Sequence, residues 1–308
     1  MRKRLFVAVI CVPALFVVMF FLPAYTFTAV IAAICAISAY ELTGAAGFRK
    51  KSRPRIYTSF AAMLVPVSEH YNMCFGERFG FSSYLVLAIL LLLMFLLFAE
   101  AVATFKNDSN KSENNDIDSL KLNNRNPDDA KAKYKVTFNQ VLAAIFAGVI
   151  IPYMLSTLIR LRAVPEGRLF VLLPVISAFI SDAGAYFVGV LIGKHPAFPN
   201  VSPKKTVEGC VGGLVIGTLS LLIYGIIIAN TTVHCVSFAG LALCGLLGAL
   251  FTELGDLAFS FVKRVYNIKD FGNLLPGHGG VLDRFDSMVF TAPIIYLLVT
   301  ILPIITIN

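Results

Sequence analysis

The stretch SSYLVLAILLLLMFLLFAEAVATF (82–105) decides the class of fold. It has no polar side chain between Leu85 and Ala99, and crossing about 30 Å of hydrocarbon takes roughly 20 apolar residues in a helix. The whole chain of 308 residues shares this character, because 57% of it is hydrophobic and only 14% is charged, whereas soluble domains have about 25% charged residues. This composition excludes a disordered chain, a collagen, a disulfide-rich scaffold and an ordinary soluble enzyme. It predicts an all-α polytopic integral membrane protein.

Nine segments are predicted to span the membrane on the same grounds of length and polarity. They are residues 5–22, 25–46, 56–70, 82–105, 138–159, 169–192, 209–229, 236–262 and 286–306. The third is short and ends in polar residues. The first follows Arg2-Lys3-Arg4, as a signal peptide would. It is long for one and a second apolar run follows almost at once, so we expect a retained helix.

Lysine and arginine indicate the orientation, because these residues accumulate in cytoplasmic loops. With a cytoplasmic N-terminus, every Lys and Arg falls on the inside except Arg78, Arg160, Arg162 and Arg168. The last three are the main departure from the rule. We therefore expect a multi-pass protein of the cell (inner) membrane, with the charged loops and an active site facing the cytoplasm.

Residues 106–135 have a different composition, rich in Asn, Asp and Lys and nearly free of large apolar side chains. Such a segment cannot bury enough apolar surface to offset the entropy of ordering it, so we expect a disordered cytoplasmic linker. The linker divides N-terminal membrane helices (1–105) from a C-terminal catalytic membrane domain (136–308), which holds nearly all the candidate chemistry.

Ionisable groups inside predicted spans are candidates for function, because burying them in lipid is costly. Asp182 lies within the sixth span, although a neighbouring helix could simply satisfy it. Glu253, Asp256, Ser260 and Lys263 form one polar stripe on the eighth span, at spacings of a helical turn. The two carboxylates repel each other and need Lys263, a metal ion or both. Their oxygens suit Mg²⁺, and an ion-pair network within the helix is the alternative.

The loop YNIKDFGNLLPGHGGVLDRFDS (266–287) joins the last two spans. Gly279 and Gly280 let the backbone come close to a ligand and offer N–H groups to an anion. Asp283, Arg284 and Asp286 follow at the mouth of the last span. Without these charges a plain turn would explain the glycines, but with them an anion site is favoured.

The loop GKHPAFPNVSPKKTVEGCVGG (193–213) carries a compact group of donors, Ser202, Lys204, Lys205 and Thr206, just before a span. Lysines and hydroxyls at the start of a helix bind phosphate. Two lysines beside a membrane are also a common topology signal. By the charge count both loops face the same side, and both carry carboxylates, which a topology signal does not need.

Carboxylates, cations and a glycine-rich turn on one side of a membrane suit metal-assisted phosphoryl or nucleotidyl transfer. The sequence has no nucleophile elbow, Cys/His pairing or P-loop, which excludes serine and cysteine hydrolases and P-loop enzymes. Its six cysteines form no CxxC pair and most lie in apolar runs, so we interpret them as small buried hydrophobes.

These residues resemble the phosphatidate cytidylyltransferases, also called CDP-diacylglycerol synthases. The family signature stands here as Ser260, Lys263-Arg264, Lys269-Asp270, Gly272, Pro276, His278-Gly279-Gly280, Asp283-Arg284 and Asp286. The stretches SDAGAYFVG and SPKKTVEG are also similar to the family, with Ala183 where relatives often have Thr. The resemblance covers about residues 170–295, and the first 160 residues match only in being apolar helices.

The resemblance implies that CTP and phosphatidic acid give CDP-diacylglycerol and pyrophosphate with Mg²⁺, in the lipid bilayer. It implies no nucleic acid partner and leaves a homodimer open. The expected catalytic residues are Asp182, Lys204, Lys205, Asp256, Lys263, Arg264, His278, Asp283 and Arg284. The expected substrate contacts are Ser181, Ser202, Thr206, Ser260, Lys269, Gly279 and Gly280, and the expected metal ligands are Asp256 and Asp283, with Glu253 in support.

Three other functions stay open at this stage. One is a CTP-dependent kinase or cytidylyltransferase acting on another membrane lipid, because any apolar groove looks alike in sequence. Another is a transporter or channel that uses Asp182, Glu253 and Asp256 as a cation path. A non-catalytic membrane scaffold would leave both charged loops unexplained.

Overall fold

The structure, a computed structural model, describes residues 16–307 apart from 51, 80–83, 116–135 and 275–278. Its long helices are α2 (Ala24–Ala45), α3 (Arg53–Phe79), α4 (Leu85–Asn115), α9 (Leu172–Ile192), α10 (Val207–Thr231), α11 (Phe238–Val265) and α12 (Leu282–Ile301). The segments α5 (Phe138–Ile145), η3 (Phe146–Ile150), α6 (Ile151–Leu155) and α7 (Thr157–Ala163) follow one another closely, and α8 (Gly167–Phe170) leads into α9. Two short antiparallel pairs complete the fold: β1 (Pro196–Phe198) with β2 (Ser202–Thr206), and β3 (His234–Val236) with β4 (Ile305–Ile307).

Seven helical segments in the described part of the chain are long and apolar enough to cross a membrane. They are Ala24–Ala45, Leu85–Thr104, Phe138–Ala163, Gly167–Ile192, Val207–Thr231, Phe238–Val265 and Leu282–Ile301. Each coincides with a predicted span, which confirms an all-α polytopic membrane protein. Most of the predicted first span, 5–22, lies outside the described residues. The predicted third span, 56–70, lies within α3, a helix of 27 residues that is more polar than the others.

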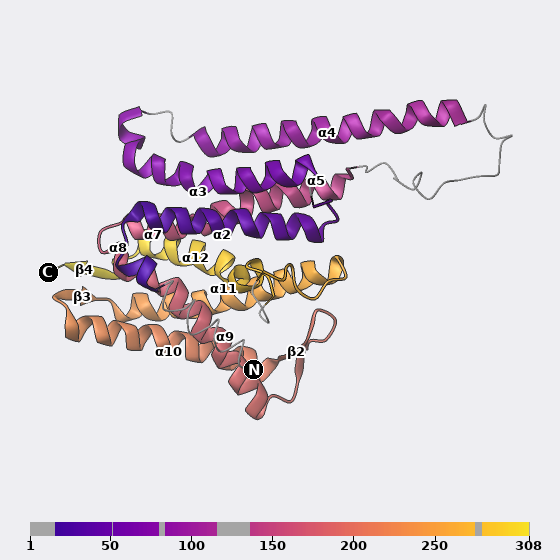
Figure 1. Ribbon diagram of the computed structural model, residues 1–308. Helices are drawn as coiled ribbons and strands as arrows, with labels where there is room; N and C mark the ends of the chain where they lie inside the picture. The colour runs from indigo at the N-terminus through magenta and orange to yellow at the C-terminus, as the bar shows by residue number, and fades with distance from the viewer. Residues whose placement is uncertain (1–15, 51, 80–83, 116–135, 275–278, 308) are drawn as a thin grey trace.

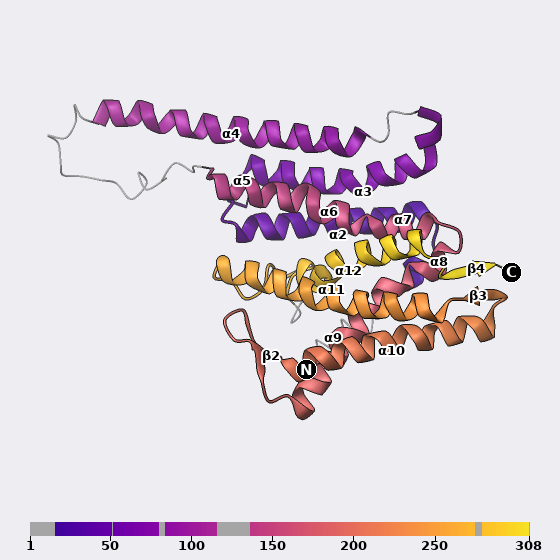
Figure 2. The ribbon, with the colours of Figure 1, turned by 180° about the vertical axis from the view of Figure 1, so that it is seen from behind.

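The long helices lie side by side in the order α4, α3, α2, α12, α11 and α10, and α9 crosses this layer obliquely beside α10 (Figures 1 and 2). We call one end of this bundle, formed by residues 46–50, 194–206 and 266–274, the polar end. It is the right-hand end in Figure 1, where the β1–β2 hairpin lies. The opposite end carries β3, β4 and the C-terminus. The loop between α9 and α10 and the loop between α11 and α12 therefore lie at the same end of the bundle (Figure 1).

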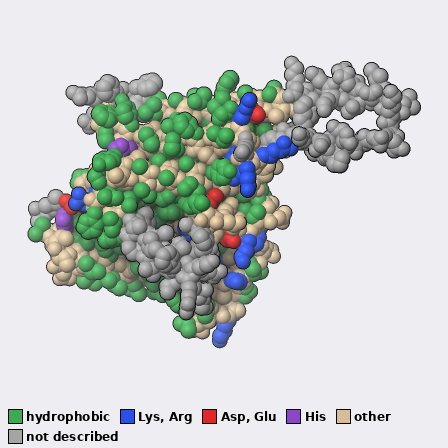
Figure 3. Space-filling view, in the orientation of Figure 1, with side chains coloured by type: hydrophobic (Ala, Val, Ile, Leu, Met, Phe, Trp, Pro, Cys, Tyr) green, Lys and Arg blue, Asp and Glu red, His purple; other side chains and the backbone are tan. Residues whose placement is uncertain are grey.

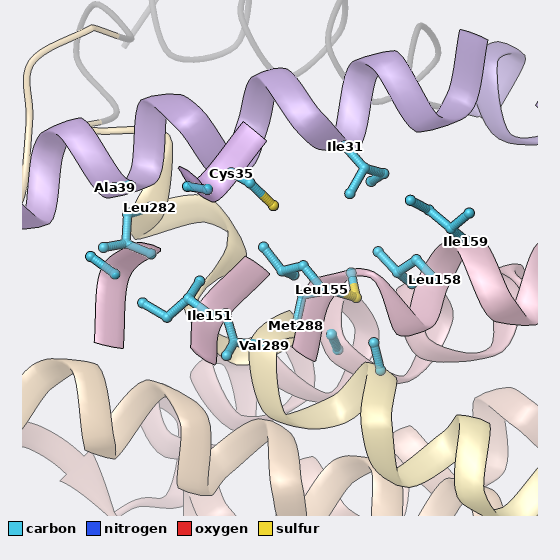
Figure 4. Packing of buried hydrophobic residues seen from close by; sticks show 14 of the residues in the cluster. Ile31, Cys35, Ala39, Ile151, Leu155, Leu158, Ile159, Leu282, Met288 and Val289 are labelled. Atoms are coloured by element: carbon cyan, nitrogen blue, oxygen red, sulfur yellow. The ribbon is translucent and has the colours of Figure 1, made fainter. Parts of the chain in front are cut away.

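Helix α2 packs into the same hydrophobic core as α12, although some 240 residues separate their facing ends. Figure 4 shows this core between three layers of helix. Its labelled side chains are Ile31, Cys35 and Ala39 from α2, Ile151, Leu155, Leu158 and Ile159 from the segment η3–α7, and Leu282, Met288 and Val289 around α12. The N-terminal helices thus support the helix that carries the last charged motif.

Glycines let α10 approach its neighbours closely. A Cβ atom at Gly213 would lie 3.0 Å from the Ala185 side chain of α9 and 3.0 Å from a carboxylate oxygen of Glu253 on α11. Ser181 donates a hydrogen bond to the Gly213 carbonyl at 3.1 Å. Small residues of α9 and α10 therefore serve close helix packing, as expected in membrane helices.

Two sequence expectations differ from the described structure. Helix α4 continues to Asn115, ten residues into the predicted linker, because extending an existing helix costs little compared with starting one. The rest of that linker lies outside the described residues. Among the cysteines, Cys35 and Cys244 are buried as expected, but Cys74 and Cys235 are exposed.

Candidate active site

A cavity of about 720 Å³ opens between α9, β2, α11 and α12, towards the polar end. Its walls carry six acids and four cations among the described residues. These are Asp182, Glu253, Asp256, Asp270, Asp283 and Asp286, and Lys204, Lys205, Lys263 and Arg284. The exposed side chains of Tyr186 and Val190 on α9 also line it, so the cavity has an apolar side as well as a charged one.

Lys205 joins the hairpin to helix α11. Its Nζ lies 2.5 Å from Oε2 of Glu253 and 2.9 Å from Oδ2 of Asp256. Burial alone would lower the pKa of Lys205, but the charges of Asp256 and Glu253 outweigh that effect and raise the pKa above its ordinary value. The adjacent Thr206 caps α10 by accepting a hydrogen bond from the N–H of Gly209 at 3.1 Å. The loop lysine, not the helical Lys263, therefore balances the two carboxylates one turn apart.

Lys263 takes part in a second group of charges, at the start of α12. Its Nζ lies 3.1 Å from Oδ1 of Asp283 and 3.5 Å from Oδ2 of Asp286. The other carboxylate oxygen of Asp283 accepts hydrogen bonds from the backbone N–H groups of Phe271 at 2.9 Å and Gly280 at 3.0 Å. Asp283 thus ties both ends of the glycine-rich loop to the helix.

Asp182 lies between these two groups. Its Oδ2 accepts a hydrogen bond from the Ser287 hydroxyl at 3.1 Å, which links α9 to α12. The backbone N–H of Ser287 in turn donates to Asp286 at 2.9 Å. The stripe on α11, the hairpin lysine, the acid of α9 and the motif of α12 therefore meet around one cavity.

The predicted site residues divide into those that line the cavity and those that do not. The lining residues among them are Asp182, Lys204, Lys205, Thr206, Glu253, Asp256, Lys263, Asp283 and Arg284. Ser181, Ser202, Ser260, Gly279 and Gly280 are not among the described residues that line it. Arg264 and Lys269 line a separate hollow with Asn267, and Arg264 Nε donates to the Val201 carbonyl at 3.1 Å. His278 lies outside the described residues.

Several residues of the site were not assigned a role from sequence. Asp270, Asp286 and Ser287 line the cavity. Glu41 of α2 is 6% exposed, and its two oxygens accept hydrogen bonds from the backbone N–H groups of Val281 at 3.0 Å and Leu282 at 2.9 Å. The signal was available for Glu41, because it is an acid within a predicted span, the same criterion that identified Asp182.

The donor atoms of the cavity fit a hard divalent cation that is shared with a phosphate substrate. Among the described residues, no three side chains of His, Cys, Asp and Glu form a site that could hold a metal ion by themselves. Mg²⁺ usually takes one or two carboxylates and completes its shell with water and substrate phosphates. Acids outnumber cations on the described walls, and Oε1 of Glu253 is buried with no hydrogen-bond partner among the described residues. The side chain of Asp256 is 30% exposed, against 2% for Asp283, so Asp256 is the more accessible of the two carboxylates.

Comparison with known proteins identifies related sequences. Residues 2–302 match the profile described as the cytidylyltransferase family. The chain is 38% identical to the phosphatidate cytidylyltransferase of Bacillus subtilis over 174 residues, which are 55% of this chain and 62% of that protein. It is 41% identical over 165 residues to the protein of that name from Mycobacterium tuberculosis, covering 54% of this chain and 49% of the relative. A Staphylococcus saprophyticus protein of the same name is 40% identical over 133 residues, 43% of this chain and 50% of the relative. The chain thus spans about half to three fifths of the length of the curated relatives it matches.

Proposed function

The chain belongs to the cytidylyltransferase family, and we propose that it transfers CMP from CTP to phosphatidic acid, giving CDP-diacylglycerol and pyrophosphate. The observation that carries this proposal is the cavity in which Lys205, Lys263 and Arg284 face several carboxylates beside apolar side chains of α9. One substrate is a water-soluble polyanion and the other an anionic lipid, so a site for both needs cations and an apolar side. The relatives named phosphatidate cytidylyltransferase support the same reaction.

In the proposed reaction an oxygen of the lipid phosphate attacks the α-phosphorus of CTP. A new P–O bond forms there as the bond to pyrophosphate breaks, and pyrophosphate leaves with the electron pair. The protein mainly positions the two substrates and neutralises charge that develops on the phosphate oxygens. Lys204, Lys205, Lys263 and Arg284 supply the positive charge from the cavity wall. The lipid phosphate is already ionised near neutral pH, so no strong general base is required, and we assign His278 to phosphate binding.

We propose Asp256 and Asp283 as the ligands of Mg²⁺, with Glu253 in support. These residues would hold the cation, which would supply positive charge to the phosphate oxygens. The four basic side chains on the described walls are outnumbered there by six acids. Asp182 lies near the nucleotide phosphates in this arrangement. Arg264, from the neighbouring hollow, assists catalysis in this proposal. Lys269 of that hollow contacts substrate, as do Ser181, Ser202, Thr206, Ser260, Gly279 and Gly280.

We further propose nine membrane spans, with a cytoplasmic N-terminus and the polar end in the cytoplasm, where CTP is available. Lys and Arg side chains gather at the polar end of the space-filling view, and much of the remaining surface is hydrophobic (Figure 3). Arg160 departs least from the charge rule, because it is paired with Glu69 at 2.8 Å. That pair also lowers the cost of placing α3 in the membrane as a span.

The chain's organisation follows from the same proposal. Residues 1–105 supply membrane helices, 106–135 connect them on the cytoplasmic side, and 136–308 carry the catalytic residues. An assembly of two copies in the inner membrane is compatible with it. The contacts of α2 with α12 make the N-terminal helices part of the working unit.

Product analysis with detergent-purified protein tests the proposed function. Incubation with CTP, phosphatidic acid and Mg²⁺ should give CDP-diacylglycerol by mass spectrometry, in the absence of any membrane gradient. A phosphorylated lipid with CDP as the by-product would instead identify a CTP-dependent kinase. Turnover with another lipid phosphate but none with phosphatidic acid would identify a cytidylyltransferase of different substrate. No turnover with any lipid would favour the transporter.

A further inference from the structure

We infer that Glu41, in the N-terminal helix α2, is a positioning residue that holds the glycine-rich loop and the start of α12 in their active arrangement. The inference rests on the proposed function for its consequence in catalysis, but its geometry stands on the structure alone. Glu41 does not line the described cavity. It acts through the residues that do.

Glu41 caps α12 from a distant part of the chain. The first N–H groups of a helix have no partner within it, and a carboxylate near them is favoured by both hydrogen bonding and the helix dipole. In the described part of the chain, the N-cap residue Val281 gives α12 no side-chain cap. The carboxylate of Glu41 takes this place with one oxygen on the N–H of Val281 and the other on the N–H of Leu282.

Two glycines of the motif make room for this carboxylate. A Cβ atom built at Gly272 or at Gly280 would collide with the carboxylate of Glu41. The sequence analysis expected Gly280 to bring the backbone close to a ligand. In the structure the close neighbour is Glu41, and the N–H of Gly280 donates to Asp283. Gly272 lies in the loop after α11, and Gly280 lies just before α12. Glu41 therefore contacts the loop at two places, one of them next to the start of α12.

Glu41 and Asp283 hold adjacent backbone groups. Asp283 accepts from the N–H groups of Phe271 and Gly280, and Glu41 accepts from the next two, those of Val281 and Leu282. Both residues are buried, at 6% exposure of the whole residue for Glu41 and 8% for Asp283. Loss of Glu41 would leave two buried N–H groups without a partner, and the helix start would move to satisfy them. Asp283 and Arg284 would move with it, away from their places on the cavity wall.

A buried acid could also serve stability alone, and Glu69 provides the matched comparison. Glu69 is 5% exposed, lies on the neighbouring helix α3 and binds Arg160. In the described structure no hydrogen bond or ion pair joins Glu69 to the loop or to the start of α12, and Glu69 does not line the cavity. Replacing either acid by Gln removes one buried carboxylate from the N-terminal helices, but only the change at Glu41 should reach the site.

The test compares Glu41→Gln and Glu69→Gln in the full-length protein in detergent. Hydrogen exchange of the peptide covering residues 279–286 should speed up in Glu41→Gln without any substrate present, and should be unchanged in Glu69→Gln. A displacement of about 1 Å in a catalytic group costs up to about 100-fold in rate, so we expect kcat/KM for CTP per folded molecule to fall about 10- to 100-fold in Glu41→Gln. Glu69→Gln should lower the unfolding temperature while kcat/KM per folded molecule stays as in the wild type.

Gly272→Ala is the second variant, in case Glu41→Gln does not fold. It displaces the carboxylate without removing a buried charge and should reproduce the local increase in exchange. Wild-type exchange and wild-type kcat/KM in whichever of these variants folds would overturn the inference, as would an equal kinetic loss in Glu69→Gln. A wild-type protein that makes no CDP-diacylglycerol would overturn the proposed function instead, and the exchange measurement would still decide the role of Glu41.

Discussion

Replacing Lys205 by methionine removes the charge that holds two carboxylates of α11 while keeping a side chain of similar length. The pair with Glu253, whose side chain is 8% exposed, falls in the class of buried pairs that cost about 3–5 kcal/mol to break from one side. The pair with Asp256, 30% exposed, adds about 0.2–1 kcal/mol. We therefore expect the free energy of unfolding to fall by about 3–6 kcal/mol.

The same substitution should weaken the transition state separately. Removing one group that stabilises developing charge on phosphate costs roughly 2–4 kcal/mol, which corresponds to a loss of about 30- to 900-fold in kcat/KM. The assay is kcat/KM for CTP, normalised to folded protein, beside thermal unfolding in the same detergent. Adding Glu253→Gln removes the unpaired buried acid, so the double variant should regain most of the stability but none of the activity.

Two lysines of the same loop serve as comparisons. Lys204 lines the cavity and is exposed, so Lys204→Ala should lose activity to a similar degree with little loss of stability. Lys194 is exposed and does not line the described cavity, so Lys194→Ala should keep kcat/KM within about twofold. Near-normal turnover per folded molecule in both Lys205→Met and Lys204→Ala would refute the reasoning and leave these lysines as topology signals.

Three further predictions concern the metal, the pH and the linker. Asp256→Asn and Asp283→Asn should both abolish turnover in protein that still inserts and purifies, and raising Mg²⁺ should hardly rescue either; wild-type activity and Mg²⁺ dependence in both would contradict the ligand assignment. Since the folded-state pKa of Lys205 is raised, its stabilising effect is fully present below the ordinary lysine pKa of about 10.4 and is lost only as the pH rises above it. The difference in unfolding temperature between wild type and Lys205→Met should therefore shrink as the pH rises above about 10.4, and a difference that stays unchanged through that alkaline range would disprove it. Shortening residues 116–135 while keeping enough chain to connect α4 and α5 should leave activity within a few-fold, and a large loss in well-inserted protein would give the linker a role.

The helices, and several residues that gather in the candidate site, could be predicted because lipid imposes a strong rule on sequence. An apolar run long enough to cross lipid forms a helix, because the helix satisfies its backbone hydrogen bonds internally. Acids are rare inside such runs, so each one is a candidate for function. Asp182, Glu253 and Asp256 were identified in this way, and they meet around one cavity. The polar third span was harder to place, because its Glu69 is satisfied by Arg160, a residue more than ninety positions away.

Pairings across elements could not be derived from spacing within one helix. Lys263 lies on the same stripe as Glu253 and Asp256, so the sequence favoured it as their counter-charge. The packing of α12 against α11 brings Asp283 and Asp286 to Lys263 instead, and the hairpin delivers Lys205 to the α11 acids. Glu41 could have been singled out as an acid within a predicted span, but nothing local predicts that its carboxylate caps a helix some 240 residues later.

Transfer of label from CTP tests the central claim most directly. The purified wild-type protein is incubated with phosphatidic acid, Mg²⁺ and CTP labelled either at the α-phosphate or at the γ-phosphate. Nucleotidyl transfer in the cavity predicts that the α-label appears in the lipid product, that the γ-label appears only in pyrophosphate, and that Asp256→Asn abolishes both. Appearance of the γ-label in the lipid, or unchanged transfer in Asp256→Asn, would contradict the account.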